Sequence, residues 1–242
     1  VVDVKKIPEL MELRYSLAKG LRLGASVPCY QIYENAEIAA AYPALADATR
    51  IIGGWQIQSR ASVGGNLCNS SPAADSIPAL IALGATCIIA GPSSQREVKV
   101  ESFCTAPGKT VLQPGELLVT LVLPPPAAKS GSAYERFIPR NEMDIAVVGA
   151  GSWLKLSADG QTVEQARIGL GAVAATPQFA AEASQWLAGK PATEDIFARA
   201  GELARNVASP ITDMRGTAEY RMHLVGVLVK RTLQGAAART AK

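Results

Sequence analysis

Two periods of apolar and polar residues run along this chain and divide it into strands and helices. Alternation with a period of two, or a short buried apolar run, predicts a β-strand. Such segments lie at 1–4, 20–26, 85–90, 97–100, 116–124, 144–157 and 163–174. Turn sequences, GPSSQ and ADGQ, join the third segment to the fourth and the sixth to the seventh. We therefore expect two β-hairpins.

Helical segments are predicted from apolar spacing of three and four residues and from capping signals. They lie near 7–11, over 30–52, over 76–83, after Thr193 and after Thr217. Pro43 should break the second of these helices. Thr193 is expected to cap its helix, and Gly235 should lie beyond the end of the last one.

A proline-, alanine- and serine-rich stretch at 124–132 reads PPPAAKSGS and is the strongest linker signal in the chain. It divides the sequence into a first domain, 1–127, and a second domain, 133–242. Long strands followed by long helices are typical of the α+β class. The sequence therefore predicts an α+β protein of two domains.

Composition excludes several classes of function. The 242 residues are 48% hydrophobic and 19% charged, and no apolar run approaches the length of about 18 residues that a membrane span needs. The net charge of +3 comes from scattered basic residues, so we expect no nucleic-acid partner. No export signal is recognisable at the start of the sequence, which favours the cytoplasm.

The four cysteines, Cys29, Cys68, Cys87 and Cys104, are widely spaced, and no Cys-x-x-Cys occurs. Neither a zinc site nor an iron–sulfur cluster has its usual ligand spacing, so we predict no metal site in this chain. Reduced, mostly buried thiols are expected instead. The single histidine, His223, lies on the last predicted helix, where a structural role is expected, and no catalytic residue is predicted.

The segment 61–75, ASVGGNLCNSSPAAD, is the strongest candidate for a binding site. Gly64 and Gly65 can adopt positive φ and carry no Cβ, so their amides can approach a ligand closely. Asn66 adds a hydrogen-bonding side chain, and the next helix directs its positive end to the same place. The pattern favours a diphosphate ligand, and the alternative is a tight glycine turn lined with polar residues.

Asp75 is the one carboxylate in this segment and cannot help to hold a phosphate. Two roles are open for it. It could accept a hydrogen bond from a ribityl or ribose hydroxyl, or it could cap the helix that begins just after it.

Several stretches together resemble a known family. QIQSRASVGGNLCNSSPAADSIPALIALGA resembles the second flavin-binding segment of the FAD subunit of molybdenum hydroxylases, the family of carbon monoxide dehydrogenase and xanthine dehydrogenase. AYERFIPRNEMDIAVVGAG resembles the family's junction between two domains. LGAVAATPQFAAEASQWLAGK and DMRGTAEYRMHLVGVLVKR resemble its C-terminal domain. The resemblance covers about 1–231.

The resemblance implies a set of residues around FAD. Nine positions match: Gly53, Ala61, Ser62, Gly64, Gly65, Asn66, Asp75, Leu118 and Arg136. Those from Ala61 to Asn66 would wrap the diphosphate and ribityl chain, and Asp75 would bind a sugar hydroxyl. Leu118 and Arg136 would lie near the isoalloxazine ring, with a plain core leucine and a solvated surface arginine as the alternatives.

The resemblance also implies a function in electron transfer. A large subunit would hold the molybdenum cofactor, and a small subunit with two 2Fe–2S clusters would pass electrons through FAD to NAD or a quinone. The fold that the resemblance implies for this chain is a PCMH-type, vanillyl-alcohol-oxidase-like FAD domain, followed by an antiparallel sheet packed with helices.

One part of the family pattern is absent from the sequence. Family members begin earlier, with a segment that carries a Gly-Gly-x-Ser-Leu loop, so the FAD domain is expected to be incomplete. The missing segment could be naturally absent, removed or supplied by another chain. Two consequences are expected: an exposed sheet edge that could form a homodimer, and a flavin-free scaffold or assembly module as the alternative function.

Overall fold

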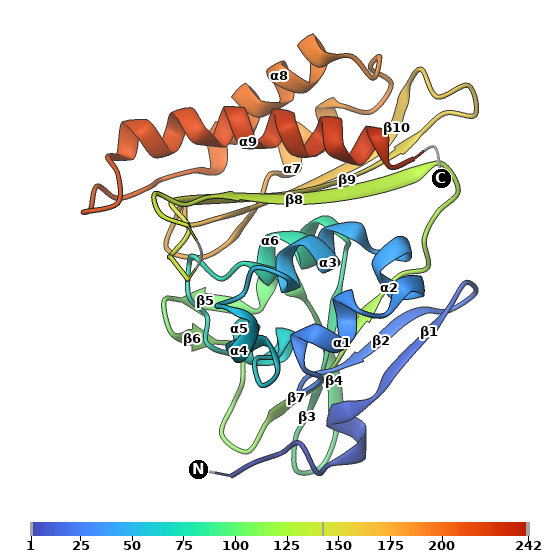
Figure 1. Ribbon diagram of the computed structural model, residues 1–242, viewed down its shortest axis with the longest axis vertical. Helices are drawn as coiled ribbons and strands as arrows, with labels where there is room; N and C mark the ends of the chain where they lie inside the picture. Colours follow the sequence, from blue (N-terminus) through green and yellow to red (C-terminus); the bar gives the residue numbers. More distant parts are fainter. Residues whose placement is uncertain (1, 142, 241–242) are drawn as a thin grey trace.

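The computed structural model describes residues 2–141 and 143–240. We call 2–123 the N-terminal unit and 130–240 the C-terminal unit. Each unit has an antiparallel sheet and its own apolar core. Figure 1 shows the sheet of the C-terminal unit between helices α7–α9 on one side and α3 and α6 on the other. The α+β class is confirmed.

The sheet of the N-terminal unit has the order β1-β2-β7-β3-β4. Its strands are β1 (Leu13–Ser16), β2 (Gly20–Gly24), β3 (Thr86–Ala90), β4 (Gln95–Lys99) and β7 (Leu117–Leu123). Four of them match predicted strands, and β3 and β4 form the expected hairpin. The strand predicted at 1–4 is wrong for residues 2–4, which have no regular structure, and residue 1 lies outside the described residues. The β1 strand escaped prediction because it is only four residues long and half of its positions are exposed.

The described part of the N-terminal unit also contains six short helices. They are α1 (Cys29–Tyr33), α2 (Ala36–Ala41), α3 (Pro43–Thr49), α4 (Trp55–Gln58), α5 (Val63–Cys68) and α6 (Ser76–Ala82). The predicted break at Pro43 is confirmed, since this proline begins α3, where its missing N–H costs nothing. A second break was missed at Asn35, whose side chain accepts a hydrogen bond from Ile38 N and begins α2.

The described residues also contain five shorter elements. They are the 3-10 helices η1 (Pro8–Met11), η2 (Val100–Ser102) and η3 (Arg205–Val207) and the strands β5 (Cys104–Ala106) and β6 (Lys109–Thr110), which pair with each other. The helix predicted near 7–11 is thus a 3-10 helix.

The sheet of the C-terminal unit has the order β11-β10-β9-β8. Its strands are β8 (Ser130–Phe137), β9 (Val148–Leu156), β10 (Val163–Gly171) and β11 (Gln178–Phe179). The hairpin of β9 and β10 is confirmed. The β8 strand begins inside the predicted linker. Gly131 serves close packing there, because a Cβ on it would lie 2.1 Å from the Ala236 carbonyl oxygen of the last helix.

The helices α7 (Ala181–Trp186) and α9 (Ala218–Ala238) cover the outer face of this sheet, and α8 (Glu194–Ala204) packs on both of them. The Thr217 cap is confirmed, since its side chain accepts from Tyr220 N. Thr193 precedes α8 as predicted but makes no such bond. The expected end of the last helix is wrong, because α9 runs through Gly235, which lies against Ala133 of β8.

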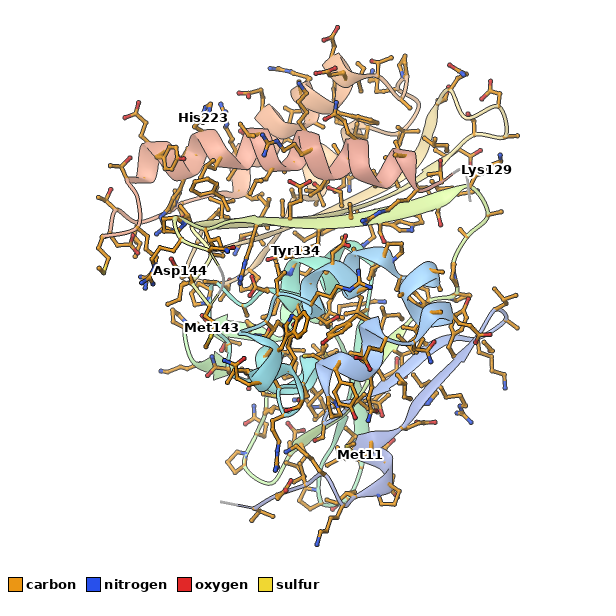
Figure 2. The ribbon with its side chains drawn as sticks, in the orientation of Figure 1. Met11, Lys129, Tyr134, Met143, Asp144 and His223 are labelled. Carbon is orange, nitrogen blue, oxygen red and sulfur yellow. The ribbon has the colours of Figure 1, made fainter. Side chains whose placement is uncertain are left out.

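The α6 helix packs on the inner face of the same sheet. Gly151 of β9 and Gly169 of β10 lie directly under it, and a Cβ at either glycine would come within 2.7 Å or less of the Pro78 carbonyl oxygen. These glycines therefore let the backbone of a helix from the N-terminal unit rest on the sheet of the C-terminal unit. Tyr134 of β8 points the same way, toward the helices of the N-terminal unit (Figure 2).

Candidate functional site

The segment 61–75 folds around the short helix α5 rather than forming an open loop. Ser62 begins this helix, and its Oγ accepts a hydrogen bond from Gly65 N at 3.0 Å. Gly64 and Gly65 lie inside the helix, so the positive φ expected for them is wrong. Positive φ occurs instead at Gly53 and at Ser70. The two glycines are needed for their missing Cβ atoms only.

The two neighbouring glycines face different surroundings. A Cβ on Gly64 would lie 2.4 Å from the Ala25 carbonyl oxygen, so this glycine lets α5 pack against the end of β2. Gly65 is exposed, and the nearest atom to a Cβ there is Ser62 Oγ at 3.1 Å. Ala61 is fixed close by, because its carbonyl accepts from Cys29 N. The start of α5 therefore presents bare backbone at the surface at Gly65.

Asn66 connects α5 to α6. Its Oδ1 accepts hydrogen bonds from Ser76 N at 3.1 Å and from Ser76 Oγ at 2.6 Å. The first helical N–H of α6 is thus used within the protein. Asp75 occupies the N-cap position but makes no capping hydrogen bond, so the capping role considered for it is wrong.

Asp75 instead binds two side chains of β8. Its carboxylate accepts from Tyr134 Oη at 2.9 Å and from Arg136 Nη1 at 2.7 Å. Burial of the carboxyl raises the pKa of Asp75 to about 6, although the Arg136 charge and both hydrogen bonds act in the opposite direction. The Arg136 side chain is only 7% exposed, so the alternative of a solvated surface arginine is wrong.

Arg136 also lines a cavity of about 390 Å³ between the two units. Gly53, Gly54 and Trp55 line the opposite side. The structure therefore brings together two of the predicted flavin residues, Gly53 and Arg136. Ala61, Ser62, Gly65 and Asn66 meet separately at the start of α5. Leu118 lies in the core of the N-terminal unit, pairs with Ile89 and is 5% exposed.

Three residues of this region were not among those predicted from the sequence. Tyr134 lies two positions before Arg136 on β8, and the period of two along a strand could have placed both on one face. Trp55 is 83% exposed, and Met143 Sδ lies 3.6 Å from Gln56 Nε2 beside it. An aromatic residue directly after a glycine pair was the available signal for Trp55.

Other predictions concern groups away from this region. His223 is exposed on α9. Cys29 and Cys87 are buried, Cys68 and Cys104 are half-buried, and all four are free thiols. In residues 2–141 and 143–240, no group of three or more histidine, cysteine or acidic side chains could hold a metal ion. Within the same residues, no helix has the length and apolar character to cross a membrane.

Each of the two units matches the model of a known protein family. The model of the FAD-binding domain in molybdopterin dehydrogenase matches residues 1–126. The model of the CO dehydrogenase flavoprotein C-terminal domain matches residues 132–236.

Individual relatives match almost the whole chain. The carbon monoxide dehydrogenase medium chain of Afipia carboxidovorans is 32% identical over 99% of this chain and 82% of its own length. The xanthine dehydrogenase FAD-binding subunit of Escherichia coli O157:H7 is 30% identical over 98% and 81%. The solved structure of carbon monoxide dehydrogenase from Hydrogenophaga pseudoflava superimposes with a TM-score of 0.91 and 31% identity, covering 98% of this chain and 81% of that one.

Proposed function

The chain belongs to the FAD-binding subunit family of the molybdenum hydroxylases, and from this membership we propose that it binds FAD and transfers electrons through it. The observation that carries the proposal is the ordered match of two family models along one chain. The electrons would come from 2Fe–2S clusters of a small subunit and leave to NAD or a quinone. Residues 1–127 would form the FAD-binding domain, 124–132 the linker and 133–242 the C-terminal domain.

The exposed backbone at the start of α5 supports a diphosphate site there. Gly65 is exposed and has no Cβ, so a ligand can approach the backbone there more closely than at any other residue type. Ser62 and Ala61 flank it, and Asn66 holds α5 against α6. Gly64 would act indirectly, by letting α5 pack on β2. These residues would hold the diphosphate and ribityl chain.

The cavity at Arg136 would receive the other part of the cofactor. FAD, when bound, supplies the redox chemistry of the reaction. Arg136 would place a fixed positive charge beside it, and Asp75 would hold that guanidinium in place through the 2.7 Å ion pair. Gly53, with φ of +60°, would let the chain turn beside the ring. Contact of Asp75 with a sugar hydroxyl and of Leu118 with the ring stay predictions.

The test is FAD retention by the purified chain, alone and co-expressed with large and small subunits. After incubation with FAD and removal of the excess, the visible flavin absorption should stay with the protein. Gly65→Ala adds one methyl group at the exposed backbone and should weaken FAD binding roughly tenfold by holding the diphosphate away from the start of α5.

Gly91→Ala is the matched control. Gly91 lies in the β3–β4 turn, where a Cβ would meet only ordinary contacts of 3.5 Å or more. This variant should keep the affinity of the parent chain. A colourless parent chain in both preparations would contradict the proposal and favour the flavin-free scaffold.

We also propose that the protein works with a molybdenum-cofactor large subunit and a 2Fe–2S small subunit. The names of its relatives, which include a medium chain and a FAD-binding subunit, support this. Affinity purification of the tagged chain from cells that express all three subunits should recover them together. A homodimer of the isolated chain and a cytoplasmic location stay predictions, and size-exclusion chromatography with light scattering would measure the former.

A further inference from the structure

A second, larger cavity lies at the other end of β8. Its volume is about 690 Å³, which is within the range of pockets that bind small organic molecules. We call it the linker cavity, because the segment 124–132 forms one of its walls. The other walls come from α2, α3, the end of α6, the β9–β10 hairpin and the end of α9. Among the described residues, its lining includes none of the nine predicted for FAD.

Most of the wall of the linker cavity is apolar. Alanines of α2 and α3 form one side, and Pro124, Pro125 and Pro126 form another. Trp153 contributes the one tryptophan among its lining residues, and its ring is only partly buried. An aromatic ring next to short aliphatic side chains provides a surface on which a flat apolar group can stack.

Strand register places polar groups beside this tryptophan. Ser132 of β8 pairs with Trp153 of β9, and Trp153 pairs with Arg167 of β10. The three residues therefore form a row across the sheet, at the side that faces α6. Arg167 is fixed there, since its Nε donates to the Ile81 carbonyl and its Nη2 to Glu101.

The charged groups around the linker cavity are mostly positive. Four cations line it, Arg50, Lys129, Arg167 and Arg239, against one carboxylate, Asp47. Arg239 already neutralises Asp47 through two hydrogen bonds, from Nη1 at 2.5 Å and from Nη2 at 3.1 Å. Arg167 is likewise paired with Glu101 at 2.9 Å, so the excess of positive charge comes from Arg50 and Lys129. An excess of positive charge at a partly apolar cavity favours an anionic ligand.

Lys129 is the cation best placed to bind such an anion. Its backbone is held by the hydrogen bond from Leu156 N to its carbonyl at 2.9 Å. Its ammonium group has no hydrogen-bond or ion-pair partner among residues 2–141 and 143–240. Figure 2 shows Lys129 at the start of β8, at the opposite end of that strand from Met143 and Asp144.

We propose that the linker cavity binds a small organic anion with a flat apolar body, of the aromatic carboxylate class. The apolar body would lie against Trp153 and the prolines, and the carboxylate would meet Lys129. Binding there would join the linker, α2–α3 and the C-terminal sheet through one ligand. This site goes beyond the proposed flavin function, and Trp153 and Lys129, which would bind the ligand, do not line the cavity at Arg136.

The experiment is a calorimetric titration of the full chain with 1-naphthoate, together with its uncharged analogue 1-naphthamide. One saturable site for naphthoate is expected, with naphthamide at least roughly tenfold weaker because it cannot form a charge-assisted bond. Equal affinity for both probes, or no saturable binding, would overturn the proposal.

Two matched variants locate the site. Lys129→Gln should weaken naphthoate binding by roughly tenfold, since it removes the charged donor from an exposed position without disturbing the core. Lys19→Gln makes the same charge change at the turn between β1 and β2 and should leave the affinity within about twofold. If both variants weaken naphthoate binding equally, the loss comes from the change in net charge. That result would contradict the role of Lys129 in binding the carboxylate.

A competition measurement separates this site from the flavin site. Saturating FAD should leave the naphthoate titration unchanged, because none of the nine predicted flavin residues lines the linker cavity and, among the described residues, the two cavities share only Arg50. Displacement of naphthoate by FAD would assign the linker cavity to the flavin and overturn the inference, while loss of FAD binding in Gly65→Ala would not affect it.

Discussion

Arg136 of β8 and Asp75, directly before α6, are joined by an ion pair of 2.7 Å although they lie 61 residues apart in sequence. Both side chains are almost fully buried. The pair connects the N-terminal unit to the C-terminal unit at the edge of the cavity that contains Gly53. Burying this ion pair fixes the two side chains relative to each other, but it also removes both charges from water. Because this desolvation shifts the pKa of the carboxyl, the contribution of the pair to the free energy of unfolding depends on pH.

The first prediction concerns that pH dependence. Burial raises the pKa of Asp75 to about 6 in the folded protein, whereas the pKa of an unburied aspartate is 3.8. Between these values the folded state binds more protons than the unfolded state, so the free energy of unfolding should fall as pH rises from 4 to 6. The loss from this group should be about 3 kcal/mol.

Asp75→Asn provides the comparison, because its side chain does not titrate. Urea unfolding of both proteins across this pH range should show the parent losing stability relative to the variant as pH rises. Other carboxyl groups titrate equally in both and cancel in the difference. The quantity compared is the free energy of unfolding of the parent minus that of Asp75→Asn. If this difference stays constant or rises with pH, the pKa of Asp75 is not raised.

The second prediction separates the two neighbouring glycines. Gly64→Ala should destabilise the protein by about 1–3 kcal/mol, because its methyl group would overlap the backbone at Ala25. Gly65→Ala should change the free energy of unfolding by less than about 1 kcal/mol, since the gain in helix propensity offsets slight crowding at Ser62 Oγ. Thermal and urea unfolding measure both, and similar losses at the two positions would contradict the packing described for α5.

The third prediction concerns a buried hydrogen bond between β9 and α9. The Ser152 and Thr232 hydroxyl oxygens are 2.8 Å apart, and Thr232 Oγ1 also donates to the Leu228 carbonyl. When the Thr232 proton is given to the Leu228 carbonyl, Ser152 is the donor of the pair. Thr232→Val leaves that buried donor without an acceptor and should cost about 1–3 kcal/mol.

Ser152→Ala is the matched change, and it should cost less, because Thr232 keeps its bond to Leu228. The double variant should be less destabilised than the sum of the two single variants, since no buried hydroxyl is then left unpaired. Urea unfolding of the four proteins gives the coupling free energy. A coupling near zero would mean that the two hydroxyls do not interact.

Local signals in the sequence were sufficient for much of the fold. Thr217 marks the start of α9 because a capping side chain acts on residues three positions away. Pro43 divides the helical layer because the constraint lies within its own residue. The β9–β10 hairpin follows from alternation on both sides of a tight turn. In each case the physical cause lies within a few residues of the signal.

The errors came from contacts between residues that are distant in sequence. Gly64 indicates an open turn until Ala25 is placed against it. Asp75 resembles a helix cap until Tyr134 and Arg136 approach it from β8. Gly235 resembles a helix end, yet it remains within α9 where that helix passes Ala133. Spacing along the chain cannot distinguish a glycine that turns the backbone from one that allows a neighbour to come close.

The position of α6 on Gly151 and Gly169 has a practical consequence for dissecting the protein. The helix is encoded with the N-terminal unit, yet its backbone lies on the sheet of the C-terminal unit. Expression of residues 130–240 alone would remove the helix that covers these two glycines in the whole chain. If the chain is instead cleaved at the exposed Pro125, the two fragments should stay associated, because α6 of the first fragment packs on the sheet of the second.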